Sequence, residues 1–330
     1  MCMTQTGWRE GGTMWHEAFH FDSLVWDGPI AIYLFLLGIS AGSATLSVLL
    51  RRQGAGSESG IIKATAILAP VSVVLGLLIL IFHLARPWTF WKLMFHYQFD
   101  SVMSMGVMLF QVYMAVLFAW LAVVFRAEIE ALRRRLLVDK LAFVDGLIGW
   151  LARLERLLAP LLLLLAVLLG AYTGFLLSAL KTYPMLNNPI LPALFLVSGI
   201  SSGVASTILL AVTLFREDGH SRGVSFVHRF ERPIVAIELF LLLCFFTGLY
   251  FGGGQREAAM WAAIGGGFWS QVFWFGVIGL GILLPQLLGR VGSPAKAHQP
   301  ARLALICSLS LVGILLLRYF ILYAGQMTVM

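Results

Sequence analysis

Eight long runs of apolar residues divide this chain, and they constrain its fold more than any other feature. Each run has about 20 residues or more, which at ~1.5 Å per helical residue crosses the ~30 Å hydrocarbon core of a bilayer. The runs cover residues 29–50, 62–84, 102–125, 157–180, 190–215, 234–252, 260–288 and 302–324. The composition, with 60% hydrophobic and 12% charged residues, excludes a soluble domain. We therefore predict an all-α integral membrane protein with eight transmembrane helices.

Positive charge is concentrated on one side of these runs. The formal net charge is +7, and most of the 23 lysines and arginines follow runs one, three, five and seven. By the positive-inside rule these connections face the cytoplasm, so both termini are periplasmic and residues 1–27 form a periplasmic segment. The membrane accounts for the basic residues, and we predict no nucleic-acid partner.

A pattern of small residues in the first run returns halfway along the sequence. Gly38 and Gly42 lie four residues apart, as do Gly199 and Gly203 in the fifth run. Such spacing lets a neighbouring helix, or a flat ligand, approach the backbone closely. The recurrence predicts two four-helix bundles, residues 28–180 and 181–330, related as a parallel internal repeat.

The longest predicted cytoplasmic connection is residues 127–155. Its apolar residues recur at steps of three and four with basic residues between them. This pattern is typical of an amphipathic helix that lies in the membrane interface. The seventh run begins among three glycines, residues 265–267, so its helix is expected to start late.

Polar side chains gather at one end of the first four runs. Asp27 and Tyr33 belong to the first run, His83 lies near the end of the second, and Tyr172 lies in the fourth. A quinone headgroup needs a hydrogen-bond donor at each carbonyl, and quinol oxidation needs a proton acceptor. We predict that Asp27, Tyr33, His83 and Tyr172 come together at similar depth. A quinol is expected to bind near Tyr33, His83 and Tyr172, and His83 or Asp27 is expected to take its proton. Taken singly, the histidine could be an interfacial residue bonded to a carbonyl, and the tyrosines could be ordinary core residues.

Haem is the obvious competing cofactor for such a subunit. A b-type haem with two histidine ligands needs two facing intramembrane histidines, and only His83 of the seven histidines lies in a run. Cys2, Cys244 and Cys307 are scattered singly, without the spacing of a metal site or an iron–sulfur cluster. We predict no haem, iron–sulfur cluster or other metal in this protein, so electrons must leave the quinol for a cofactor on another subunit.

Two charged residues fall inside apolar runs of the second half. Glu238 lies in the sixth run and Arg318 in the eighth. An unpaired charge in lipid is expensive, so the two could pair. A structural ion pair is the preferred interpretation, and part of a proton path is the alternative.

Three segments resemble the NrfD/PsrC family, which includes the polysulfide reductase membrane subunit. They are Tyr33 with the glycines that follow it, the box from His83 to Pro87 that contains Arg86, and the segment Gly170–Phe175 around Tyr172. The resemblance spans residues from about 19 to 329, and it is closest to membrane subunits of formate-dependent nitrite reductase systems. It implies a multi-pass protein of the bacterial inner membrane that oxidises menaquinol near the periplasmic face of the first bundle. Tyr33, His83, Arg86 and Tyr172 are the quinone-binding residues expected on this basis.

The resemblance also implies partners and leaves some alternatives open. Electrons are expected to pass to a periplasmic ferredoxin-like subunit with four 4Fe–4S clusters and then to a c-type cytochrome nitrite reductase. The position of Tyr33 is histidine in the polysulfide reductase subunit, and that of His83 is acidic in some relatives, so the hydrogen bonds to quinone can differ. The alternative functions are a non-catalytic membrane anchor for a periplasmic oxidoreductase and a transporter.

Overall fold

The computed structural model describes residues 18–54, 56–84, 86–135, 142–216, 222–290 and 299–329. Within these residues eight helices are long and apolar enough to cross a membrane, which confirms the eight predicted spans. Seven of them lie in α2 (Gly28–Arg52), α3 (Gly60–His83), α5 (Val102–Val124), α8 (Glu155–Ser178), α9 (Leu191–Thr213), α10 (Arg222–Phe251) and α15 (Pro300–Gln326). Within α10 the span is Pro233–Phe251. The other is built from α12 (Gly267–Gln271), the π-helix η3 (Val272–Leu283) and α13 (Leu284–Arg290).

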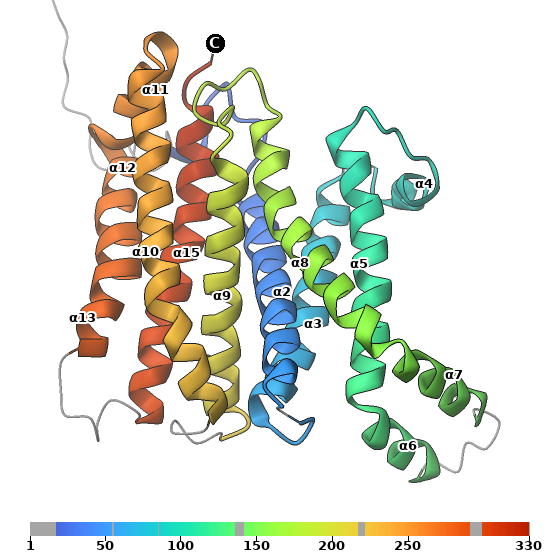
Figure 1. Cartoon of the computed structure of the whole chain (residues 1–330). Helices are drawn as coiled ribbons and strands as arrows, with labels where there is room; N and C mark the ends of the chain where they lie inside the picture. Colours follow the sequence, from blue (N-terminus) through green and yellow to red (C-terminus); the bar gives the residue numbers. More distant parts are fainter. Residues whose placement is uncertain are drawn as a thin grey trace, which may run out of the picture.

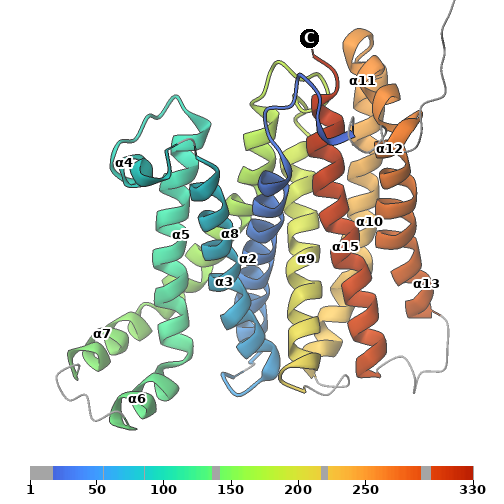
Figure 2. The same ribbon diagram turned by 180° about the vertical axis from the view of Figure 1, so that it is seen from behind.

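Helices α2 and α9 lie side by side at the centre of the protein (Figure 1). The helices α3, α5 and α8 pack on one side of this pair, and α10, α15 and the seventh span pack on the other (Figures 1 and 2). The first four spans therefore gather around α2, where they enclose the predicted site. The internal repeat between residues 28–180 and 181–330 stays a prediction.

The two copies of the glycine pattern make the contact between α2 and α9. A Cβ atom on Gly42 would lie 2.5 Å from the carbonyl oxygen of Gly199 and 2.9 Å from the Cα of Gly203. Any side chain there would push the two backbones apart. This matters because lipid supplies no hydrophobic force between helices, so close packing must hold them together. The pattern was predicted to admit either a neighbouring helix or a flat ligand, and the structure shows a neighbouring helix there.

The seventh span is the least regular of the eight. The short helix α11 (Gly254–Ile264) precedes it, and the backbone turns at Gly267, whose φ of +84° lies in the region that favours glycine. The span therefore begins at Gly267, which confirms the late start expected from the three glycines. This break lies at the end of the span, next to α11, and not at its middle (Figure 1).

The connection between α5 and α8 contains two helices, so the prediction of one amphipathic helix was wrong. They are α6 (Arg126–Arg135) and α7 (Ala142–Arg153), and residues 136–141 lie outside the described residues. Both helices project sideways from the bundle (Figures 1 and 2). Since α5 and α8 pack together, the connection must return to where it began, and a single helix over residues 127–155 would be about 40 Å long.

Residues 18–27 cross the end of the bundle and are fastened to α15. The side chain of Gln326 accepts hydrogen bonds from the backbone N–H of Val25 at 2.9 Å and Trp26 at 3.0 Å, and donates one to the Trp26 carbonyl at 2.8 Å. The Tyr183 hydroxyl donates to the carbonyl of Ser23 at 2.7 Å. These bonds fix the residue before α2, which is Asp27. Of the predicted segment 1–27, residues 1–17 lie outside the described residues.

Candidate functional site

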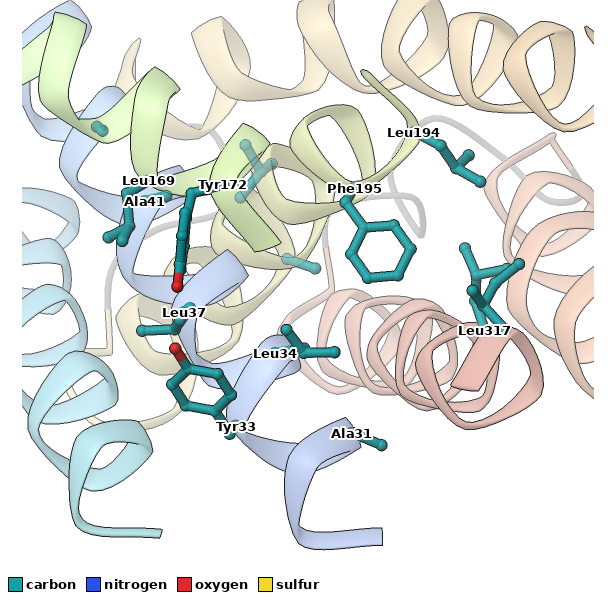
Figure 3. Close-up of a cluster of buried hydrophobic side chains, with 14 of the residues drawn as sticks. Ala31, Tyr33, Leu34, Leu37, Ala41, Leu169, Tyr172, Leu194, Phe195 and Leu317 are labelled. Atoms are coloured by element: carbon teal, nitrogen blue, oxygen red, sulfur yellow. The ribbon is translucent and has the colours of Figure 1, made fainter. Parts of the chain in front are cut away.

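The two predicted tyrosines meet inside the first four spans. Tyr33 on α2 and Tyr172 on α8 are buried, with 1% and 8% of their surface exposed. Their hydroxyl groups point toward each other (Figure 3). Neither hydroxyl makes a hydrogen bond with another described residue. The pair therefore presents two hydrogen-bond donors without protein acceptors on two buried side chains.

Small and aromatic neighbours set the positions of these two rings. Phe110 of α5 packs edge-on against both rings, with its ring centroid 6.3 Å from that of Tyr33 and 5.6 Å from that of Tyr172. A Cβ atom on Gly106 would overlap the Tyr172 ring, so only glycine leaves room for it. Gly76 of α3 faces the Tyr33 ring less tightly, since a Cβ atom there would lie 3.6 Å from that ring. The rings are thus packed in place before any ligand arrives.

An apolar groove between α5 and α8 leads to Tyr172 from the lipid-facing surface. Its volume is about 680 Å³, and its walls include Met105 and Met108 of α5 and Leu168 and Phe175 of α8. All four of these side chains are exposed on the protein surface, so the groove opens sideways, toward lipid. The volume and the apolar walls suit a lipid-soluble ring with a hydrocarbon tail.

Asp27 and His83 form a second polar group nearer the end of the helices. The His83 Nε2 lies 3.5 Å from the Asp27 Oδ1, and the two side chains are 32% and 46% exposed, respectively. Tyr33 packs against Gly76 of the antiparallel helix α3. Asp27 lies six residues before Tyr33 and His83 lies seven residues after Gly76, so the Asp27–His83 pair lies about 9–10 Å along the helices from Tyr33. The four residues predicted at similar depth therefore form two groups, because six residues of helix separate the members on α2.

Two tyrosines of the last span, which the sequence reasoning missed, border Asp27. The rings of Tyr319 and Tyr323 stack at 6.0 Å and 8°, and their hydroxyl oxygens lie 3.3 and 3.5 Å from a Cβ atom placed on Gly28. Tyr323 also stacks on Trp269 of α12 at 4.9 Å. Their spacing of four residues places both on one helix face, but only the packing of α15 beside α2 reveals what that face meets.

Arg86, the remaining predicted quinone ligand, lies past the end of α3. Its side chain makes no hydrogen bond or ion pair with a described residue. Its backbone carbonyl accepts a hydrogen bond from the Thr89 hydroxyl at 2.9 Å. The structure does not bring its side chain to the tyrosine pair, and a role in quinone binding stays a prediction.

Glu238 and Arg318 are both buried, but the predicted direct ion pair between them is not formed. Arg318 instead donates from Nη2 to the Phe195 carbonyl at 3.1 Å, and its guanidinium lies 3.8 Å from the centre of the Phe195 ring. Glu238 borders a small cavity of about 20 Å³ with Ser201 and Ser310, enough for about one water molecule. The contacts with Phe195 of α9 thus stabilise part of the Arg318 guanidinium. A charge in lipid needs such partners, because an unpaired one is expensive there.

The polar residues of the site are side chains that donate and accept hydrogen bonds and protons. They are the tyrosine hydroxyls, a histidine and a carboxylate, next to an apolar groove. Such groups bind and deprotonate an organic substrate. The part of the chain that the structure describes holds no group of three or more histidine, cysteine, aspartate or glutamate side chains arranged to bind a metal ion.

Comparison with known proteins places the chain among respiratory membrane subunits. Residues 16–330 match the family described as "Polysulphide reductase, NrfD". The chain is 58% identical to "Protein NrfD" of Escherichia coli over 95% of its length and 98% of that protein. It is 52% identical to "Protein NrfD homolog" of Haemophilus influenzae, over 94% of its length and 97% of that protein. It is 39% identical to the C subunit of polysulfide reductase from Wolinella succinogenes, over 95% and 98%.

Proposed function

Since this chain belongs to the NrfD family and is a membrane subunit of a respiratory oxidoreductase, we propose that it oxidises quinol. The observation that carries the proposal is the pair of facing hydroxyl groups of Tyr33 and Tyr172, without protein acceptors, of which Tyr172 lines a groove open to lipid. A quinol diffuses within the bilayer, so its entrance must face lipid as this groove does. Menaquinol is the substrate we propose, following the resemblance.

In this proposal the quinol ring lies at the tyrosine pair and its tail lies in the groove between α5 and α8. Each tyrosine hydroxyl donates a hydrogen bond to one of the ring oxygens, and these bonds hold the ring for oxidation. Oxidation converts the quinol to quinone, with release of two protons and two electrons. His83 accepts the two protons one at a time through its ring nitrogen and gives up the first before it takes the second, and Asp27 stabilises the charge that forms each time.

The separation of the two polar groups adds a requirement to this mechanism. A proton that leaves the ring at Tyr33 must cross about 9 Å to reach the Asp27–His83 pair, which exceeds one hydrogen bond. Water molecules must therefore carry it toward the end of the helices. The exposure of both side chains of the pair allows them to release it to solvent.

We further propose the orientation and the electron acceptor. The arginine-rich connections face the cytoplasm, and the end that carries Asp27 and His83 faces the periplasm of a bacterial inner membrane. Quinol must transfer its two electrons as it is oxidised, and the resemblance assigns their acceptor to a partner. It is a ferredoxin-like periplasmic subunit with 4Fe–4S clusters, which passes electrons toward a c-type cytochrome nitrite reductase.

The test is anaerobic oxidation of a menaquinol analogue by membranes that contain this protein together with its iron–sulfur partner. Tyr172→Phe removes one donor and keeps the ring, so we expect about a tenfold fall in kcat/KM, as for one lost hydrogen bond. Tyr250→Phe, at the exposed end of α10, is the matched control and should leave the rate unchanged. Full activity of both Tyr172→Phe and His83→Ala would contradict the proposal and leave the protein as an anchor.

A further inference from the structure

The helix α7 and the start of α6 border an open polar cavity that has no part in the proposed quinol chemistry. Its volume is about 650 Å³, and it is lined by Arg126, Gly146, Gly149, Trp150, Ala152 and Arg153. Both helices project from the bundle at the end opposite to α4 (Phe90–Phe95) and α11 (Figures 1 and 2). The cavity is thus far along the spans from the Asp27–His83 pair.

Two arginines give this cavity its positive charge. The Arg126 Nε donates to the Glu130 carboxylate at 2.8 Å, which leaves its two terminal nitrogens 3.8 and 4.0 Å from a Cβ atom placed on Gly149. Arg153 makes no ion pair with a described residue. Glu130 offsets the charge of Arg126 in part, and the described lining residues include two guanidinium groups and no carboxylate, so the cavity keeps a net positive charge.

The two glycines leave open space in the cavity, beside the Arg126 guanidinium. A Cβ atom on Gly146 would meet nothing within 4 Å, and one on Gly149 would meet only the Arg126 guanidinium. A larger side chain at either position would occupy the cavity. The site thus combines open volume with arginine donors, whose planar geometry matches the oxygens of a phosphate.

Exposed apolar side chains place the cavity at the membrane surface. Trp150, a wall of the cavity, is 55% exposed, and Leu147 beside it on α7 is also exposed. Exposed leucines continue along the start of α8 at Leu157, Leu161 and Leu164. An exposed tryptophan between basic residues and a run of exposed leucines is typical of the headgroup level of a bilayer.

We propose that this cavity binds the phosphodiester headgroup of an anionic phospholipid. Arg126 and Arg153 hold the phosphate oxygens, and Trp150 lies at the boundary between glycerol and acyl chains. The acyl chains follow the exposed leucines of α8. Basic cavities between helices at the membrane surface are suited to such headgroups, and bound lipid would hold α6 and α7 against the bilayer.

Native mass spectrometry of the purified full-length protein tests the proposal. The protein is titrated with phosphatidylglycerol and, separately, with phosphatidylcholine of the same acyl composition, and inorganic phosphate is added as a competitor. We expect phosphatidylglycerol to bind more tightly. The variant with Arg126→Gln and Arg153→Gln should weaken its binding about fivefold for each guanidinium, or about 25-fold in total.

Two further variants separate a built site from general surface charge. Arg52→Gln removes an exposed arginine at the end of α2, outside the cavity, and should keep phosphatidylglycerol binding within about twofold. Gly149→Leu keeps every charge but fills the cavity, and should lose most of the binding. The proposal is overturned if the two lipids bind equally, if Arg52→Gln matches the double variant, or if Gly149→Leu binds normally. Displacement of the lipid by millimolar inorganic phosphate would also overturn it, in favour of a free-anion site.

Discussion

The contact between α2 and α9 predicts a large penalty for adding a single methyl group. In Gly42→Ala the new Cβ atom would lie 2.5 Å from the Gly199 carbonyl oxygen, where an ordinary carbon–oxygen contact is at least about 3.3 Å. The helices must separate by about 0.8 Å, because the obstacle is backbone and has no rotamer to change. Overpacking of this kind lowers the free energy of unfolding by about 1–3 kcal/mol.

Gly248→Ala is the matched control for this variant. Its Cβ atom would lie 4.0 Å from the nearest atom, the Cδ1 of Ile190, so the alanine fits. Both variants make the same chemical change inside a transmembrane helix, so the gain in helix propensity largely cancels. The difference between their unfolding free energies, measured by denaturation in mixed detergent micelles, then isolates the steric contact.

A second substitution checks that the penalty belongs to one interface. A Cβ atom on Gly203 would lie 2.5 Å from the Cα of Gly42, in the same contact. Once Gly42→Ala has separated the helices, Gly203→Ala should cost less than it does alone, so the two effects should not add. If Gly42→Ala and Gly248→Ala unfold with equal free energies, the reasoning about this contact is refuted.

Three further predictions concern the site. Gly106→Ala should raise KM for quinol and leave the melting temperature nearly unchanged, since the added methyl displaces the Tyr172 ring. Michaelis kinetics and a thermal melt would measure the two effects separately. Gln326→Leu removes the bonds to Trp26 and should speed amide exchange there at least tenfold, as hydrogen-exchange mass spectrometry would show; unchanged exchange would contradict the fastening role. Asp27→Asn keeps the size of the side chain but removes the charge that stabilises a protonated His83, so quinol oxidation should slow; a rate equal to that of the wild type would contradict the role given to Asp27.

The candidate site was predictable as a set of residues but not as an arrangement. Tyr33 and Tyr172 stand out in sequence because polar groups in apolar spans are rare, and the structure does bring them together. A spacing of six residues already separates Asp27 from Tyr33 along α2. The position of His83 depends instead on how α2 packs against α3, which no single segment reveals. The same holds for Arg318, whose contacts are with Phe195 rather than with Glu238.

Hydropathy determined the eight spans, because the transfer of each helix into lipid depends on that helix alone. The glycines at 265–267 likewise marked the start of the seventh span, because positive φ is a local property. The fastening of residues 18–27 by Gln326 and the pair of helices α6 and α7 were decided only in three dimensions. Both depend on where the ends of separate spans lie relative to one another. That geometry follows from close packing such as the contact between α2 and α9, in which segments more than 150 residues apart meet backbone to backbone.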